Sequence, residues 1–470
     1  SIGDPVTDLG RASLLWATQA WVGGRWQRGV VLRIGADGCW SEFTTDVHHA
    51  PVGATVLDGP VLPGLVNAHS HAFQRAFAGL AERRENDADD FWSWRDRMYG
   101  VALRITPAQL RAIAAQLFVE LLQGGYTQVC EFHYLQHQAD GGAYADPAEL
   151  SWALSDAAED AGIGLTMLPV LYERAGFSEP ALRADQRRFA TAPASVCALL
   201  QTLNAARRPN VNAGVAIHSL RAASLESIQD LLRRIGSDDV PLHVHVAEQI
   251  REVDDCVAAT GMRPIQWLAR HAALDSRWQL VHATHASAEE IDSVAKSGAG
   301  IVICPSTEAN LGDGVPDLPR WLDAGVPIAL GSDSQVTRDW PEELRWLEYA
   351  QRLVLRRRNV AAAPAKGEPS TAARLFNLAL PAGARAAGQV RWGLELGARA
   401  DALVLGLRAP GMLGIPSERM LDALIFAADA AAICTVYVAG RVLVERGQHS
   451  EAQRIAARFK EVMADLWSVA

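Results

Sequence analysis

Eight short apolar runs recur between residues 61 and 333, separated by polar residues and by longer stretches with helical periodicity, such as 107–122, 224–235 and 288–296. Apolar strands that alternate with helices are typical of a parallel sheet covered on its outer face, and eight strands close a TIM-like (β/α)₈ barrel. An open doubly wound sheet is the competing architecture, but no glycine-rich phosphate loop follows the first run. The runs are 61–67, 127–132, 164–171, 214–217, 240–246, 278–281, 300–304 and 326–330.

The two flanks of this region have a different pattern. Residues 12–60 and 400–445 contain alternating apolar runs with Gly-Gly and Asp-Gly turns, which indicate short β-strands. Neither flank is large enough to bury a core alone. We therefore predict one small β-sandwich domain built from both chain ends. The predicted division is 1–60 and 396–470, the latter including a C-terminal helix, around a barrel at 61–395.

Composition narrows the choice of partners. The formal net charge of the 470-residue chain is -10, which argues against nucleic acid, because phosphate binding needs a basic face. No apolar stretch approaches the roughly 20 residues that span a bilayer, and the first residues lack a secretory signal pattern. The six cysteines are scattered, with no CxxC pair, as expected for reduced thiols. We expect a soluble cytoplasmic protein without a membrane partner.

Polar residues follow four of the apolar runs, at the strand ends where a barrel places its active site. His69 and His71 follow the first run, and their spacing on an extended segment points both side chains to one side. Each residue alone could be a core histidine or a helix-capping aspartate, but only a closed barrel brings all of them to one point. Imidazoles and a carboxylate suit zinc or another first-row divalent ion, with room for water. The later residues of this kind are His245 and Glu248, His282, and Asp333.

Two stretches resemble the amidohydrolase superfamily. Residues 62–71, Leu-Pro-Gly-Leu-Val-Asn-Ala-His-Ser-His, are similar to its first-strand signature, and 393–405 resemble the return of the chain to the small β-domain. The resemblance implies a metal-bearing barrel. It also implies that the metal ligands are His69, His71, His245 and Asp333.

The number of metal ions follows from the lysines. Binuclear members of the superfamily usually bridge two ions through a carboxylated lysine at the end of strand four, but the only lysines here are Lys296, Lys366 and Lys460, none at a strand end. We predict one divalent ion, with zinc favoured, as in the deaminase branch. The same resemblance assigns Glu248 and His282 to catalysis.

A closer resemblance is to the formimidoylglutamate deiminases, and it rests on residues 71–75, 91–95, 131–134, 218–221 and 306–314. It implies hydrolysis of N-formimidoyl-L-glutamate to N-formyl-L-glutamate and ammonia, a step of histidine degradation. Asp333 would accept a proton from the attacking water, Glu248 would relay protons, and His282 would hydrogen-bond the attacking oxygen. The chain departs from the family pattern at Gln335, where a histidine is expected. The residues implied to bind the glutamate-like carboxylates are Gln74, Arg95, Tyr134, His218 and Arg221.

Two rival functions are open at this point. An enzyme with the same metal ligands could deaminate an aromatic base such as guanine, or a triazine, although a planar ring would not require two arginines. A non-catalytic barrel would be expected to have lost ligands, and here they are present. Relatives suggest a homodimer, and we expect the aromatic cluster 91–94 to pack beneath Arg95.

Overall fold

The computed structural model describes residues 13–84 and 86–468, which form two compact units. One unit comprises the described residues up to Gly64 together with Val390–Ser450, and the other comprises Leu65–Gln389 together with the described residues from Glu451 onward. The first predicted apolar run is therefore divided. Its beginning, β5 (Val61–Leu62), joins the sheet of the first unit, whereas β6 (Leu65–Ser70) joins the barrel, because Pro63 and Gly64 interrupt the strand.

The first unit is a nine-stranded sheet of order β18-β17-β16-β15-β5-β1-β2-β3, with β4 on β1. Its strands come from both ends of the chain, as predicted. Gly23 and Gly24, both at positive φ, make the turn of the β1–β2 hairpin. Leu15, Val30 and Val404 lie in its apolar core. The other bounds are β1 (Ser13–Val22), β2 (Arg25–Ile34), β3 (Trp40–Thr44), β4 (Thr55–Val56), β15 (Ala402–Leu405), α13 (Met420–Phe426), β16 (Ile433–Val438), β17 (Arg441–Glu445) and β18 (Gln448–His449).

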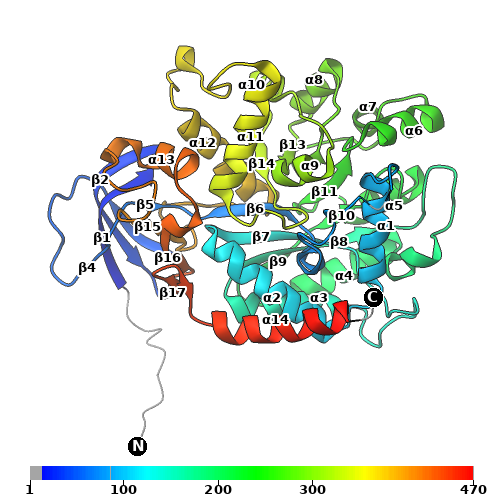
Figure 1. Ribbon diagram of the computed structural model, residues 1–470, viewed down its shortest axis with the longest axis horizontal. Helices are drawn as coiled ribbons and strands as arrows, with labels where there is room; N and C mark the ends of the chain where they lie inside the picture. Colours follow the sequence, from blue (N-terminus) through cyan, green and yellow to red (C-terminus); the bar gives the residue numbers. More distant parts are fainter. Residues whose placement is uncertain (1–12, 85, 469–470) are drawn as a thin grey trace, which may run out of the picture. The chain divides into compact units, whose positions relative to one another are not determined.

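The second unit contains the predicted parallel barrel (Figure 1). Neighbouring strands run in the order β14-β13-β12-β11-β10-β8-β7-β6, with β9 on β8. The circle closes where Ser70, at the end of β6, bridges Asp333, just beyond β14. The strands are β7 (Tyr126–His133), β8 (Gly164–Leu171), β9 (Val211–Ala213), β10 (Val215–Ile217), β11 (Leu242–Val246), β12 (Trp278–His282), β13 (Gly300–Ile303) and β14 (Ile328–Leu330).

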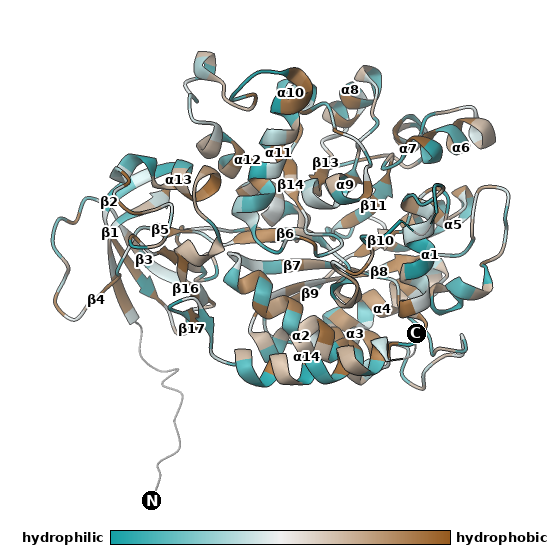
Figure 2. Cartoon of the chain, in the orientation of Figure 1, coloured by the Kyte–Doolittle hydropathy of each residue, from teal (hydrophilic) through white to brown (hydrophobic). Residues whose placement is uncertain are grey.

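Helices cover the barrel, and Figure 2 shows apolar residues along its strands and polar residues on the outward faces of the helices. Capping residues set several helix starts; Thr106 caps α2 with Pro107 at the first helical position, and Ser287 forms a capping box with Glu290 on α8. No described helix is long and apolar enough to span a bilayer. The bounds are α1 (Phe91–Ala102), α2 (Pro107–Gln123), α3 (Glu149–Ala161), α4 (Pro193–Ala205), α5 (Leu225–Ile235), α6 (Ile250–Thr260), α7 (Pro264–His271), α8 (Ala288–Ser297), α9 (Pro305–Leu311), α10 (Leu318–Asp323), α11 (Trp340–Leu355), α12 (Thr371–Ala386) and α14 (Ala452–Trp467).

The C-terminal helix α14 packs on α2 of the barrel unit (Figure 1). The Trp467 ring stacks on Phe77 with centroids 6.1 Å apart, and the Trp467 indole donates to the Ala76 carbonyl at 3.0 Å. The predicted division groups this helix with residues 396–470, whereas its contacts assign it to the barrel unit. The domain bounds of 1–60, 61–395 and 396–470 stay a prediction.

Candidate metal centre and active site

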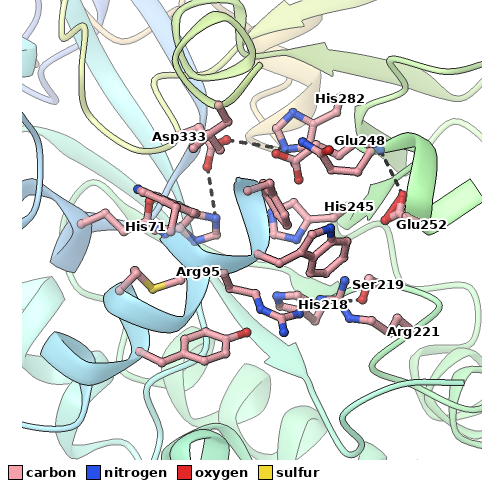
Figure 3. A pocket seen from close by; sticks show the side chains of 18 of the residues that line it. His71, Arg95, His218, Ser219, Arg221, His245, Glu248, Glu252, His282 and Asp333 are labelled. Atoms are coloured by element: carbon pink, nitrogen blue, oxygen red, sulfur yellow. Dashed lines mark hydrogen bonds and ion pairs between the residues drawn. The ribbon is translucent and has the colours of Figure 1, made fainter. Parts of the chain in front are cut away.

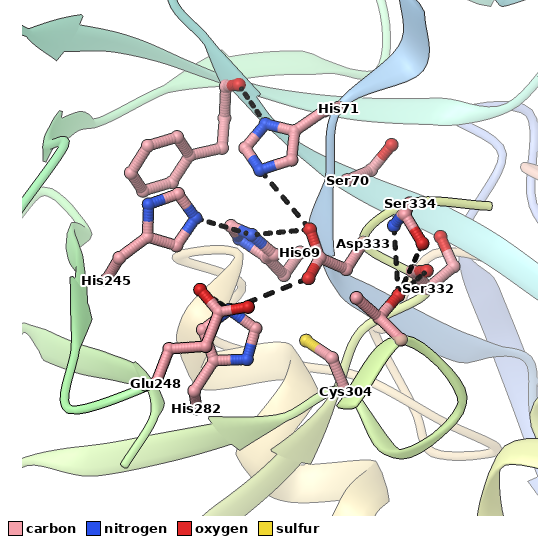
Figure 4. A network of polar contacts seen from close by, with 12 residues as sticks. His69, Ser70, His71, His245, Glu248, His282, Cys304, Ser332, Asp333 and Ser334 are labelled. Atoms are coloured by element: carbon pink, nitrogen blue, oxygen red, sulfur yellow. Dashed lines mark hydrogen bonds and ion pairs between the residues drawn. The ribbon is translucent and has the colours of Figure 1, made fainter. Parts of the chain in front are cut away.

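Closure of the barrel brings the four predicted metal ligands together (Figure 4). His69 is in β6, His71 follows it, His245 is in β11, and Asp333 follows β14. The Nε2 atoms of His69 and His245 are 3.0 Å apart. Asp333 Oδ1 lies 3.3 Å from His69 Nε2 and 3.3 Å from His71 Nε2. Side chains from three separate strand ends therefore aim nitrogen and oxygen atoms at one point.

The hydrogen bonds and protonation of these groups suit a cation. His71 Nδ1 donates to the Phe132 carbonyl at 2.9 Å, which leaves the lone pair on Nε2 facing Asp333. Burial lowers the pKa of His69 to about 3 and that of His245 well below its usual range, so both rings are neutral. Two neutral ring nitrogens that face each other at 3.0 Å repel unless a proton or a cation lies between them. Three imidazoles and a carboxylate are the donor set that zinc prefers, so these residues fit the metal.

Strained backbone aims two of the site's side chains. His282 (φ 76°) and Asp333 (φ 52°) adopt the left-handed conformation that non-glycine residues rarely take. Such strain costs on the order of 1–3 kcal/mol per residue and persists only where the surroundings enforce it. Here the enforcing contacts are backbone bonds across the closure: Asp333 N donates to His69 O at 2.9 Å, and His71 N donates to Asp333 O at 3.2 Å.

Gln335, at the position where the resemblance led us to expect a histidine, reinforces this closure. Its buried side-chain amide donates to the Asp333 carbonyl at 2.9 Å and to Ser70 Oγ at 2.8 Å. Its amide oxygen accepts from Ser332 Oγ at 2.6 Å. Gln335 thus fastens the end of β14 to the end of β6, and the departure from the family pattern leaves the ligands in contact.

His282 lies among carboxylates beside the ligands. Its Nδ1 donates to Glu308 Oε2 at 2.9 Å, while its Nε2 is 3.4 Å from Glu248 Oε2 and 3.5 Å from Asp333 Oδ2. Burial alone would lower the pKa of His282, but Glu248, Glu308 and Asp333 together raise it to about 10. The ring therefore carries a proton on Nε2, directed at the space between Glu248 and Asp333.

Glu308 is a residue of this candidate site that the sequence did not predict. It lies on the short helix α9 after β13, it is 3% exposed, and its carboxylate also accepts from Cys304 N at 2.8 Å. The signal that could have identified Glu308 is its position within residues 306–314, one of the stretches that resemble the formimidoylglutamate deiminases. The contact with His282 fixes which ring nitrogen of that histidine faces the site.

A pocket open to solvent extends from the ligands (Figure 3). Asp333, Glu248 and His282 lie at one end of it, and Arg95 and Arg221 at the other. His69 lies behind the wall, fully buried. The predicted site residues that line the cavity are His71, Gln74, Arg95, Tyr134, His218, Arg221, His245, Glu248, His282 and Asp333.

The two arginines have unfilled hydrogen-bonding capacity. Arg95 is 8% exposed, and its guanidinium lies 4.7 Å from the Trp92 ring and 5.5 Å from Tyr99. The guanidinium of Arg221 lies 5.3 Å from the same Trp92 ring. Among the described residues, neither Nε atom has a hydrogen-bond partner. Burial lowers the pKa of Arg95. Two desolvated cations side by side call for anionic groups on the ligand.

The remaining predicted binding residues contact each other at the same end. Tyr134 lies between His71 and His218, with ring centroids 5.2 and 5.4 Å away, and Gln74 lines the same cavity. His218 Nδ1 bonds with Ser219 Oγ at 3.0 Å, and burial holds the pKa of His218 well below its usual range. Trp92, expected only to pack, also lines the cavity and contacts both arginines.

Residues 61–443 match the sequence model of the Amidohydrolase family. The chain therefore belongs to this family of hydrolases. A formimidoylglutamate deiminase from Pseudomonas aeruginosa is 45% identical over 455 residues, which cover 97% of this chain and 99% of that protein. The crystal structure of an amidohydrolase from Brucella melitensis superposes with a TM-score of 0.90 at 40% identity, over 97% of this chain and 99% of that one. The fold also matches an adenosine deaminase from Xanthomonas campestris with bound zinc, with a TM-score of 0.79 and 22% identity over 97% and 98% of the two chains.

Proposed function

We propose that this protein hydrolyses N-formimidoyl-L-glutamate, with water, to N-formyl-L-glutamate and ammonia. The observation that carries the proposal is the pair of arginines, Arg95 and Arg221, that face the metal-site residues across one cavity. The substrate has a reactive amidine carbon at one end and two carboxylates at the other, which matches this arrangement. The 45% identity to the deiminase from Pseudomonas aeruginosa, over nearly the whole of both chains, supports the same reaction.

One divalent ion, with zinc favoured, would be held by His69, His71, His245 and Asp333. When bound, the ion supplies Lewis acidity, which lowers the pKa of a coordinated water from about 15.7 to about 7. No lysine lines the cavity in the part of the chain that the structure describes, which supports a single ion without a carbamate bridge. Zinc in the adenosine deaminase of the same fold supports the choice of metal.

Three side chains would move or hold protons. Asp333 accepts a proton from the attacking water, and Glu248, whose carboxylate faces His282 Nε2 at 3.4 Å, passes protons to the departing nitrogen. The protonated Nε2 of His282 donates to the attacking oxygen and stabilises the charge that develops on it. The C–N bond to the terminal nitrogen breaks, the new C=O bond forms, and ammonia leaves.

The glutamate portion would bind at the arginine end. Each guanidinium can hold a carboxylate through two parallel hydrogen bonds, and the unfilled Nε atoms of Arg95 and Arg221 are available for this. Gln74, Tyr134 and His218 add hydrogen bonds around the same carboxylates. Because the carboxylates are remote from the reacting carbon, the arginines set binding and orientation.

An ammonia-release assay tests the proposal, with formimidoylglutamate and guanine measured in parallel, each with and without a chelator. We expect chelator-sensitive turnover of formimidoylglutamate, restored by added zinc. Turnover of guanine alone would show that the protein deaminates aromatic bases instead. A purified protein without any divalent ion, and without activity after zinc addition, would favour a non-catalytic barrel.

We also propose that the enzyme acts in histidine degradation, that it is located in the cytoplasm, and that it forms a homodimer. The reaction consumes a linear amidine of glutamate, which is a breakdown product of histidine. Helix α11 exposes apolar side chains, among them Trp346, Leu353 and Val354, that a second subunit would cover. Light scattering after size exclusion tests this, because Leu353→Asp should halve the mass of a dimer that uses this face. A monomeric wild-type protein would contradict it.

A further inference from the structure

Asp313, in the loop that follows helix α9, is a buried acid that the roles above do not use. It is 4% exposed, and its main-chain oxygen accepts from His285 Nε2 at 2.8 Å. One carboxylate oxygen, Oδ1, accepts from the side-chain amide of Gln249. Among the described residues, no arginine or lysine forms an ion pair with Asp313. The carboxyl group is thus held in place without a cation to balance an ionised form.

The carboxyl group of Asp313 lies beside that of Glu248. A carboxylate oxygen of Asp313, one of Glu248 and a ring nitrogen of His282 all lie within 4.8 Å of one another. Asp313 Oδ2 is buried and receives no hydrogen from any described residue. Two carboxylate oxygens in this position repel unless one carries a proton, as in other paired acids. Because Oδ1 already accepts from an amide, Oδ2 is the oxygen that can carry it.

The charged groups around Asp313 come from several elements, and most are acids. Glu248 follows β11, Glu308 is on α9, and Asp333 follows β14, while His282 of β12 carries the nearby positive charge. Burial, and next Glu248, raise the pKa of Asp313 well above its usual range. The surroundings therefore favour a neutral carboxylic acid at this position.

We propose that Asp313 is a positioning residue that stays protonated and donates its Oδ2 hydrogen to the carboxylate of Glu248, holding that carboxylate toward the substrate nitrogen. The inference rests on the proposed role of Glu248. A hydrogen bond from a neutral acid fixes the side-chain rotamer of Glu248, so that its carboxylate stays directed at the departing nitrogen to which it passes protons. Asp313 transfers no proton in this scheme, so it acts only through Glu248.

The Asp313→Asn variant distinguishes this role from the alternative, in which Asp313 is ionised and attracts the cationic amidine. In Asp313→Asn, the new side chain would accept from Gln249 with its oxygen and donate to Glu248 with its amide, but it cannot carry negative charge. We expect Asp313→Asn to retain kcat/KM within about threefold. We expect Asp313→Ala to lose about 10- to 100-fold, mainly in kcat, since a hydrogen bond to a charged group is removed. Asp323→Asn, at an exposed acid that ends α10, is the matched control for loss of a carboxylate.

Two further measurements, an infrared spectrum and a pH profile, test whether Asp313 is protonated. At neutral pH, the infrared difference spectrum of wild type minus Asp313→Asn should contain a carboxylic acid C=O band, which needs no substrate. The alkaline limb of the kcat profile should lie at higher pH in Asp313→Asn than in the wild type. An Asp313→Asn variant as impaired as Asp313→Ala, or a difference spectrum with an ionised carboxylate band, overturns the proposal. The infrared result stands even if formimidoylglutamate is not the substrate, so the two failures can be told apart.

Discussion

Replacement of Arg95 by methionine should separate substrate binding from stability. Arg95 is 8% exposed, and its guanidinium forms one ion pair within 4 Å among the described residues, with the exposed Asp96 at 3.8 Å. In the free enzyme the cation is stabilised chiefly by the Trp92 and Tyr99 rings, at 4.7 and 5.5 Å. Such contacts contribute about 0.5–2 kcal/mol, whereas burial of an incompletely paired charge costs several kcal/mol. Methionine has a similar length and removes both effects, so we expect an unchanged or higher melting temperature.

The effect on catalysis should be large and in the opposite direction. Removal of one partner from a buried, hydrogen-bonded charge pair costs about 2–5 kcal/mol, which corresponds to a loss of about 30- to 5,000-fold in kcat/KM. Because the substrate carboxylate that Arg95 would bind does not change during the reaction, most of the loss should appear as a higher KM. Ammonia release over a range of substrate concentrations separates KM from kcat, and a thermal melt measures stability in the same samples.

Arg251→Met is the matched control. The guanidinium of Arg251 lies 4.9 Å from the same Trp92 ring, but its side chain is 65% exposed. We expect a change in kcat/KM of less than about threefold, because solvent screens exposed charges. An unchanged KM in Arg95→Met, or an equal loss in Arg251→Met, would refute the assignment of Arg95 to carboxylate recognition.

Three further predictions concern Glu248, Gln335 and Glu343. Glu248→Ala should lower kcat by about 10²- to 10⁴-fold without loss of metal, measured by ammonia release and metal analysis, and a near-normal kcat would contradict the proton relay. Gln335→Ala removes buried hydrogen bonds to Asp333 O, Ser70 Oγ and Ser332 Oγ, each worth about 0.5–1.5 kcal/mol, so calorimetry should show a lower melting temperature, and an unchanged one would contradict this role of Gln335. Glu343 is buried and bonds Ser306, and burial raises its pKa, so its stabilising contribution is complete below about pH 4.3 and declines as the pH rises toward the folded-state pKa. Glu343→Gln should therefore raise the melting temperature more at pH 8 than at pH 5, and the reverse order would contradict a neutral Glu343.

The fold and the residues at strand ends could be predicted because both depend on local pattern. Apolar runs of strand length separated by helical periodicity define the barrel, and the residue after each run must lie at its mouth. His69, His71, His245 and Asp333 follow from that rule even though Asp333 is far along the chain from the first pair. The rule fails within the first apolar run. It did not detect that Pro63 and Gly64 divide the first run between two sheets, since both halves are apolar.

Residues that act through another side chain could not be predicted in this way. Glu308 is 26 positions from His282, and no spacing rule relates a residue on α9 to the end of β12. In the sequence, Asp313 precedes a glycine and looks like an ordinary acidic residue of a turn. Its partner becomes evident only when the loop after β11 is seen against it. Such contacts are set by how helices and loops lie over the barrel mouth, which sequence periodicity does not encode.

The division of charge within the cavity explains why a linear substrate suits this site better than an aromatic base. An amidine is a base and carries positive charge near neutral pH, so it suits the end where Glu248 and Asp333 lie. A neutral ring that filled the same cavity would displace water from Arg95 and Arg221 and leave both guanidiniums without acceptors, at a cost of several kcal/mol. The carboxylates of a glutamate tail replace that water with charge-assisted hydrogen bonds. If Arg95 and Arg221 have the proposed role, selection for the linear amidine would come from the penalty that the two arginines impose on uncharged ligands, as well as from their contacts with the substrate.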